Sequence, residues 1–163
     1  MGTQPVDAVK SGDVEGLRAA LTADPSLAHA RPDGQRTLLH VLTDWPGHRP
    51  RALQTLAVLL AAGADVDAPF VGEHTETPLH WAASADDVIL IDGLLDAGAN
   101  LEARGGVPPP ITPLDDAWAF GQWNAARRLV ERGARPTLND PERLAREGGA
   151  TDLADWAAGL SGG

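Results

Sequence analysis

Two stretches of this 163-residue chain could carry acid–base chemistry, because each places a histidine four residues before a polar side chain. His40 precedes Asp44, and His80 precedes Ser84. Residues four apart share one face of a helix, so each pair could act together. An imidazole beside a carboxylate can move a proton of a bound molecule near neutral pH. Such chemistry would be metal-free and would suit a small apolar substrate.

A third candidate is the acid pair Asp115-Asp116, which lies close to Trp118 in the sequence. Burial of a carboxyl group in apolar surroundings raises its pKa. One of the two acids could therefore give or take a proton near neutral pH, as an alternative to a purely structural role.

Other kinds of catalytic and metal-binding motif are missing. The chain has no cysteine and no tyrosine, and it contains no nucleophile elbow, phosphate-binding loop or His-Glu-x-x-His pattern. Asp65-x-Asp67 and Asp86-Asp87 could supply oxygen ligands, but they lack the spacing of a calcium-binding loop. We therefore predict neither a metal nor a cofactor.

A repeated pattern must position these side chains. The dipeptide Gly-Ala recurs every 35 residues, as Gly63-Ala64, Gly98-Ala99 and Gly133-Ala134. A second motif precedes each copy, as Thr37-Leu38-Leu39-His40, Thr77-Pro78-Leu79-His80 and Thr112-Pro113-Leu114-Asp115. Threonine is a good N-cap, proline suits the first helical position, and glycine suits the residue that ends a helix. Each copy therefore predicts a pair of helices that must stack on its neighbours to bury its apolar face.

These motifs resemble the ankyrin-repeat family, whose units start with Thr-Pro-Leu-His and end with Leu-Leu-x-x-Gly-Ala. The resemblance implies a single all-α domain, an ankyrin-repeat solenoid of about five helix-turn-helix units with short projecting turns. It suggests an N-terminal capping repeat at about 5–30, full repeats at 33–68, 72–103 and 107–136, and a C-terminal capping repeat at 137–160. It further implies that the first helices line a concave face and that His40 and His80 make structural hydrogen bonds.

Candidate partner-binding residues are those at which the repeats differ. Trp45 and Phe120 hold the same position in the second and fourth units and flank Ala85 of the third, which describes an aromatic notch. Asp44 and Ser84 precede Trp45 and Ala85 directly. Trp45 also opens a turn five residues longer than its counterparts, and loops enlarged by proline and glycine often carry function.

The projecting turns offer further contacts. The tip before the third unit carries two extra residues and includes Phe70, Val71, Glu73 and His74. An exposed Phe70 would mark a binding surface, whereas a Phe70 folded back over the neighbouring tip would only stabilise the turn.

The remaining tryptophans have a structural and a functional interpretation. Trp118 stands where the family prefers alanine, so it either widens the aromatic surface or packs in the core and separates the helices. We expect Trp123 and Trp156 to pack in the core, and we expect Trp81 to face the space between the helices of its unit.

The charge distribution narrows the choice of partner. The formal net charge is −10, and no lysine or arginine lies between Arg51 and Arg104, where nine acids occur. This argues against nucleic acid and against an anionic membrane surface. Downstream the sign reverses, and Asp92 and Arg127 are expected to pair across adjacent second helices. A basic or apolar segment of another protein is the natural ligand.

The chain shows no secretory signal and no apolar run long enough to span a bilayer, so we expect a cytoplasmic protein. Its single lysine and its abundant Ala, Gly, Asp and Arg are typical of a GC-rich bacterial genome.

Together these features predict an acidic, monomeric protein-interaction module rather than an enzyme. The expected partner-binding residues are Asp44, Trp45, Phe70, Glu73, His74, Ser84, Trp118 and Phe120. The alternative is a small-molecule-binding protein or cofactor-free enzyme that uses the aromatic notch, with His40, His80, Asp115 or Asp116 as acid or base.

Overall fold

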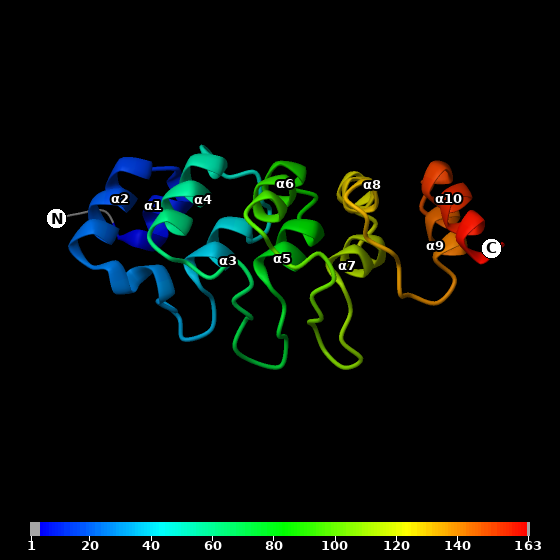
Figure 1. The fold of residues 1–163 in the computed structure, drawn as a ribbon, viewed down its shortest axis with the longest axis horizontal. Helices are drawn as coiled ribbons and strands as arrows, with labels where there is room; N and C mark the ends of the chain where they lie inside the picture. Colours follow the sequence, from blue (N-terminus) through cyan, green and yellow to red (C-terminus); the bar gives the residue numbers. More distant parts are fainter. Residues whose placement is uncertain (1–3, 163) are drawn as a thin grey trace.

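Helices follow one another in packed pairs, and the pairs stack along one axis with the two ends of the chain at opposite ends of the stack (Figure 1). The computed structural model describes residues 4–162. Within them, the first helices of the pairs are α1 (Pro5–Ser11), α3 (Leu38–Thr43), α5 (Pro78–Ser84), α7 (Pro113–Ala119) and α9 (Pro141–Glu147). The second helices are α2 (Val14–Ala23), α4 (Ala52–Ala61), α6 (Val88–Asp96), α8 (Trp123–Glu131) and α10 (Thr151–Ser161). A 3-10 turn, η1 (Pro25–His29), follows α2.

The core runs along this stack and uses the residues of the repeated motifs. Leucines of the first helices (Leu39, Leu79 and Leu114) and of the second helices (Leu59, Leu94 and Leu129) are at most 1% exposed. Burying one such side chain contributes about 1.5–3 kcal/mol. Ala82, Ala83 and Ala117 are fully buried, and their small side chains let neighbouring first helices approach closely. The predicted helical solenoid is confirmed.

The first helix of the second unit is shorter than the sequence suggested. Helix α3 ends at Thr43, and Asp44 has an extended backbone with ψ 144°. Trp45 precedes Pro46, and a residue before proline is driven out of the helical region. The prediction that His40 and Asp44 share a helix face is therefore wrong.

The long turn after Trp45 is held by the next unit. The backbone N–H of His48 donates to Oδ2 of Asp87 at 2.7 Å, while Oδ1 of Asp87 accepts from Leu90 at the start of α6. Gly47 adopts a φ of 74°, and a side chain there would press on Ala85 at 3.0 Å. This turn is thus a fixed part of the stack that presents Trp45.

Trp118 lies in the core between the last two pairs of helices. Its side chain is 2% exposed, it contacts the rings of Trp123 and Trp156 at centroid distances of 5.9 and 6.4 Å, and its indole N–H donates to the carbonyl of Pro141 at 3.0 Å. A tryptophan in place of alanine therefore fills the space between these two pairs of helices and does not widen the partner-binding surface.

Ion pairs connect the second helices on the outer side. Asp92 on α6 pairs with Arg128 at 2.7 Å and with Arg132 at 3.0 Å, because these arginines lie one turn apart, on α8 and at its C-cap. Arg127 pairs with Asp152 on α10 instead. The predicted pairing of Asp92 with Arg127 is wrong, although charges do pair laterally between units. No helix in residues 4–162 combines the length and apolar character needed to cross a membrane.

Candidate functional site

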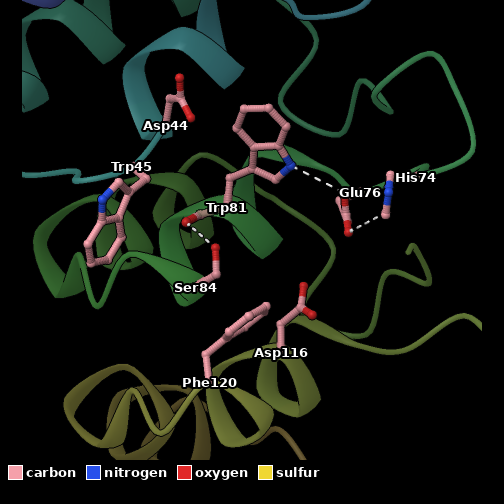
Figure 2. A pocket seen from close by; sticks show the side chains of 8 residues that line it. All are labelled: Asp44, Trp45, His74, Glu76, Trp81, Ser84, Asp116 and Phe120. Atoms are coloured by element: carbon pink, nitrogen blue, oxygen red, sulfur yellow. Dashed lines mark hydrogen bonds and ion pairs between the residues drawn. The ribbon is translucent and has the colours of Figure 1, made fainter. Parts of the chain in front are cut away.

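An open cleft of about 320 Å³ crosses the ends of α3, α5 and α7. This volume is at the small end of ligand sites, which span roughly 300–1,000 Å³. The residues that line the cleft are Asp44, Trp45, His74, Glu76, Trp81, Ser84, Asp116 and Phe120 (Figure 2). Five of the eight predicted partner-binding residues line it: Asp44, Trp45, His74, Ser84 and Phe120.

Aromatic side chains surround the cleft. Trp45 and Phe120 are 69% and 66% exposed, an unusual state for such large apolar groups. Trp81 is half-buried between them, and its indole N–H points at the carboxylate of Glu76, with an Nε1–Oε2 distance of 3.4 Å (Figure 2). Ser84, whose hydroxyl donates to the carbonyl of Trp81 at 3.0 Å, lies on the same helix and lines the cleft, whereas Ala85 is buried.

The prediction that Trp81 belongs to the core between its helices is wrong. The indole packs edge-to-face with the ring of His40, with ring centroids 5.0 Å apart and an interplanar angle of 76°. It also lines the cleft. Trp81 immediately follows the motif histidine His80, but the sequence does not show which side of this helix stays open, because that depends on the packing of neighbouring units. Glu76, the other lining residue outside the predicted set, precedes the N-cap Thr77.

Phe70 and Glu73 lie outside the cleft lining. Phe70 is half-buried and folds back onto Trp81 and His40, with ring centroids 5.7 and 6.2 Å away. It therefore supports Trp81 from behind and does not project from the tip. Glu73 is exposed on the tip, and Val71 beside it is 48% exposed.

His40 and His80 are fully buried and form structural hydrogen bonds, as the resemblance implied. The Nδ1 atom of His40 accepts the backbone N–H of Thr37 at 3.3 Å, so Nε2 carries the proton and donates to the carbonyl of Glu76 at 3.0 Å. His80 repeats the arrangement with Thr77 at 3.1 Å and with Ile111 at 3.0 Å. Burial lowers the pKa of His40 to about 4 and also lowers the pKa of His80.

In the second, third and fourth units a threonine N-cap is hydrogen-bonded to the side chain three residues later, and we call such a pair a latch. The latches are Thr37–His40, Thr77–His80 and Thr112–Asp115. In the third latch the acid replaces the histidine, and its carboxylate accepts from the backbone N–H of Thr112 at 3.2 Å. A carboxylate cannot donate a hydrogen bond. Asp115 therefore contacts N–H groups of the next unit, whereas the two histidines donate to carbonyls there. It accepts from the amides of Thr137 and Leu138 at 2.7 and 3.3 Å. These bonds occupy Asp115 fully, and neither it nor the two histidines lines the cleft.

Asp116 behaves differently from its neighbour. Its side chain is only 7% exposed, and it points into the cleft from α7 (Figure 2). Within residues 4–162, no hydrogen bond or ion pair joins its carboxylate to another group, and its oxygen atoms are not fully buried but open onto the cleft. Burial raises the pKa of Asp116 to about 7, and the nearby negative charges of Glu76 and Asp115 add to the shift. Of the four acid–base candidates, only Asp116 faces the cleft.

The other two carboxylates of the cleft already have partners. Asp44 pairs with Arg36 at 2.8 Å, and Arg36 is also held by Asp33. Glu76 lies 3.6 Å from Nδ1 of His74 in addition to its contact with Trp81. The backbone of Glu76 is fixed by Gly105 in the next tip, where a Cβ atom would meet the Cα of Glu76 at 2.7 Å. No cluster of three potential metal-ligating side chains occurs in the described part of the chain.

Comparisons with known proteins agree with the repeated architecture. The ankyrin repeat family model matches residues 74–106, which include the end of the tip, α5 and α6 of the third unit. An E3 ubiquitin-protein ligase, KEG, of Arabidopsis thaliana is 38% identical over 58% of this chain and 6% of its own length. A palmitoyltransferase of Drosophila melanogaster is 31% identical over 80% of this chain and 19% of its own length. The protein PhlB of Serratia liquefaciens is 35% identical over 82% of this chain and 54% of its own length. The chain thus spans about half or less of each of these relatives.

Proposed function

This chain belongs to the ankyrin-repeat family, and on that premise we propose that it binds another protein through the cleft lined by Trp45, Trp81 and Phe120. Ankyrin repeats generally mediate protein–protein interaction. The observation that carries the proposal is the exposure of Trp45 and Phe120 on either side of a cleft that also holds three carboxylates. Exposed aromatic side chains at the centre of a surface are the usual anchors of a protein interface.

The shape of the cleft supports an interaction module over an enzyme. It is open to solvent, so a reacting group would stay hydrated, and water exclusion is part of most catalytic sites. His40, His80 and Asp115 are engaged in the latches, which leaves Asp116 without a second acid–base group of the predicted set beside it. An open cleft with an acidic floor suits a segment of a partner chain with basic or apolar side chains.

The test compares two double variants of the whole chain. Replacing Trp45 and Phe120 by alanine removes the two exposed anchors, whereas replacing Leu53 and Ile89 removes two similarly exposed apolar side chains, on α4 and α6. We expect the first variant to lose a partner captured from the native host by at least tenfold in affinity, because interface anchors are worth on the order of 2 kcal/mol each. The second variant should bind normally.

Both variants should keep the circular dichroism spectrum of the wild type, since none of the four side chains is buried. Binding that survives in the Trp45→Ala, Phe120→Ala variant, or that is lost equally in the Leu53→Ala, Ile89→Ala variant, would place the interface elsewhere.

A further inference from the structure

We infer that the cleft receives an arginine side chain of the partner, stacked against its aromatic rings and hydrogen-bonded to the carboxylates of Asp116 and Glu76. This inference rests on the proposed function and names the chemistry of the partner. It starts from Asp116, a residue that is only 7% exposed yet lines the open cleft, and whose carboxylate has no hydrogen-bond or ion-pair partner within residues 4–162.

Charge complementarity selects a cation as the occupant. Asp116 and Glu76 line the cleft together, and the charge of Glu76 raises the pKa of Asp116, so the two carboxylates repel one another. A bound cation would remove this repulsion and compensate the burial of Asp116. The third unit, which forms the middle of the cleft, cannot supply that cation as lysine or arginine, because the sequence holds neither between Arg51 and Arg104. Arg36 reaches the cleft only at Asp44.

The surrounding rings add a second requirement, a cation that can also stack. Trp45, Trp81 and Phe120 line the cleft, and a cation over an aromatic face gains from the electrons of the ring. Trp81 lies next to Glu76, with its indole Nε1 3.4 Å from the carboxylate, so a group that binds Glu76 would also meet the indole.

Guanidinium fits these demands better than ammonium. It is planar and weakly hydrated, and its five N–H donors can serve two carboxylates while its face lies on a ring. An ammonium group has three donors and holds its water more strongly, so it would give up more hydration to enter between Trp45 and Phe120. The formal charge of −10 would also attract an arginine-containing segment over a distance.

The direct test titrates the whole chain at pH 8 with Nα-acetyl-arginine N-methylamide and with its citrulline counterpart, which has nearly the same shape and no charge. The indole N–H resonances of the tryptophans report binding. We expect saturable shifts for the arginine compound with a dissociation constant on the order of 1 mM, the range of a single side chain, and none for citrulline. Equal binding of the two compounds, or tighter binding of the lysine counterpart, would overturn the inference.

A matched pair of variants assigns the effect to the cleft. Asp116→Asn keeps the shape of the side chain and removes its charge, and we expect it to weaken the arginine compound at least tenfold. Asp7→Asn removes the same charge from an exposed site at the start of α1 and should leave binding unchanged. Unchanged binding in Asp116→Asn would refute the role of Asp116, and its stability in urea shows that the variant is folded.

The outcomes separate this inference from the proposed function. A partner that is lost with Trp45→Ala, Phe120→Ala but kept with Asp116→Asn would bind in the cleft without using arginine. In that case the inference fails and the proposed function stands. A partner that is kept by both variants would overturn both.

Discussion

The latches and the cleft use the same kinds of residue in opposite ways. In the latches, His40, His80 and Asp115 are fully buried, and their side chains are hydrogen-bonded both to their own N-cap and to the next unit. In the cleft, Asp116 is almost as buried as its neighbour Asp115 and has no such partner in residues 4–162. Two adjacent aspartates on one helix therefore differ in role because they face different surroundings. Asp115 is therefore part of the framework that joins the units, whereas the carboxylate of Asp116 is open to a group that enters the cleft.

The largest expected change in stability follows from breaking the third latch. Replacing Asp115 by alanine leaves the buried amide of Thr112 and the amides of Thr137 and Leu138 without their acceptor. We expect the free energy of unfolding to fall by about 3–5 kcal/mol, the range for disrupting a buried hydrogen-bond network. Urea denaturation followed by circular dichroism measures it. A loss below about 1 kcal/mol would mean that the latch does not hold the last pair of helices.

At the neighbouring residue, Asp116, a substitution is expected to raise the free energy of unfolding instead of lowering it. Asp116→Asn should stabilise the free chain at pH 8 by roughly 2–4 kcal/mol, because the wild type must bury a charge there and the variant does not. The pKa of Asp116 is raised from its ordinary value to about 7. The stability that the protonated acid contributes is therefore complete below pH 4 and is lost as the pH rises to about 7.

The difference in unfolding free energy between Asp116→Asn and wild type should accordingly be near zero at pH 4 and should grow up to pH 7 or 8. His40 works in the opposite direction: burial lowers its pKa to about 4, so its contribution is lost as the pH falls from 6.5 towards 4. His40 is unchanged in the variant and cancels in the difference. A variant that is less stable than wild type at pH 8 would show that the charge of Asp116 is compensated within the chain.

The smallest expected effect concerns exposed charges on the outer side. Asp96 pairs with Arg132 at 2.8 Å, but its side chain is 72% exposed. Asp96→Asn should change the free energy of unfolding by no more than about 1 kcal/mol, and the change should shrink at high salt. A larger change would mean that lateral ion pairs, and not the latches, connect the units.

The fold could be predicted almost completely from the sequence. Three copies of Thr-x-Leu-His/Asp and Gly-Ala at a fixed period determine where helices begin and end, since caps and apolar spacing act locally. The exception at α3 has a local cause as well, because Pro46 ends the helix early. The third latch could not be anticipated in detail, because its partners at Thr137 and Leu138 lie more than twenty residues away.

The cleft could be predicted only in part. Comparing equivalent positions identified Trp45, Ser84 and Phe120, because residues at the same place in successive repeats lie side by side in a stack. It misplaced Trp118, Trp81 and Phe70, since their exposure depends on the space between neighbouring units and on the way each tip folds back. A tryptophan where alanine is usual fills that space at Trp118, and Phe70 supports Trp81 from behind.

The sequence by itself thus determined the repeat, its helices, its acidic character and the positions at which the units differ. Only the tertiary structure decided which of two adjacent aspartates is satisfied and which of five tryptophans face solvent. The physical reason is that periodicity and capping are properties of a few consecutive residues. Burial and hydrogen-bond satisfaction instead depend on groups brought together from different units of the stack.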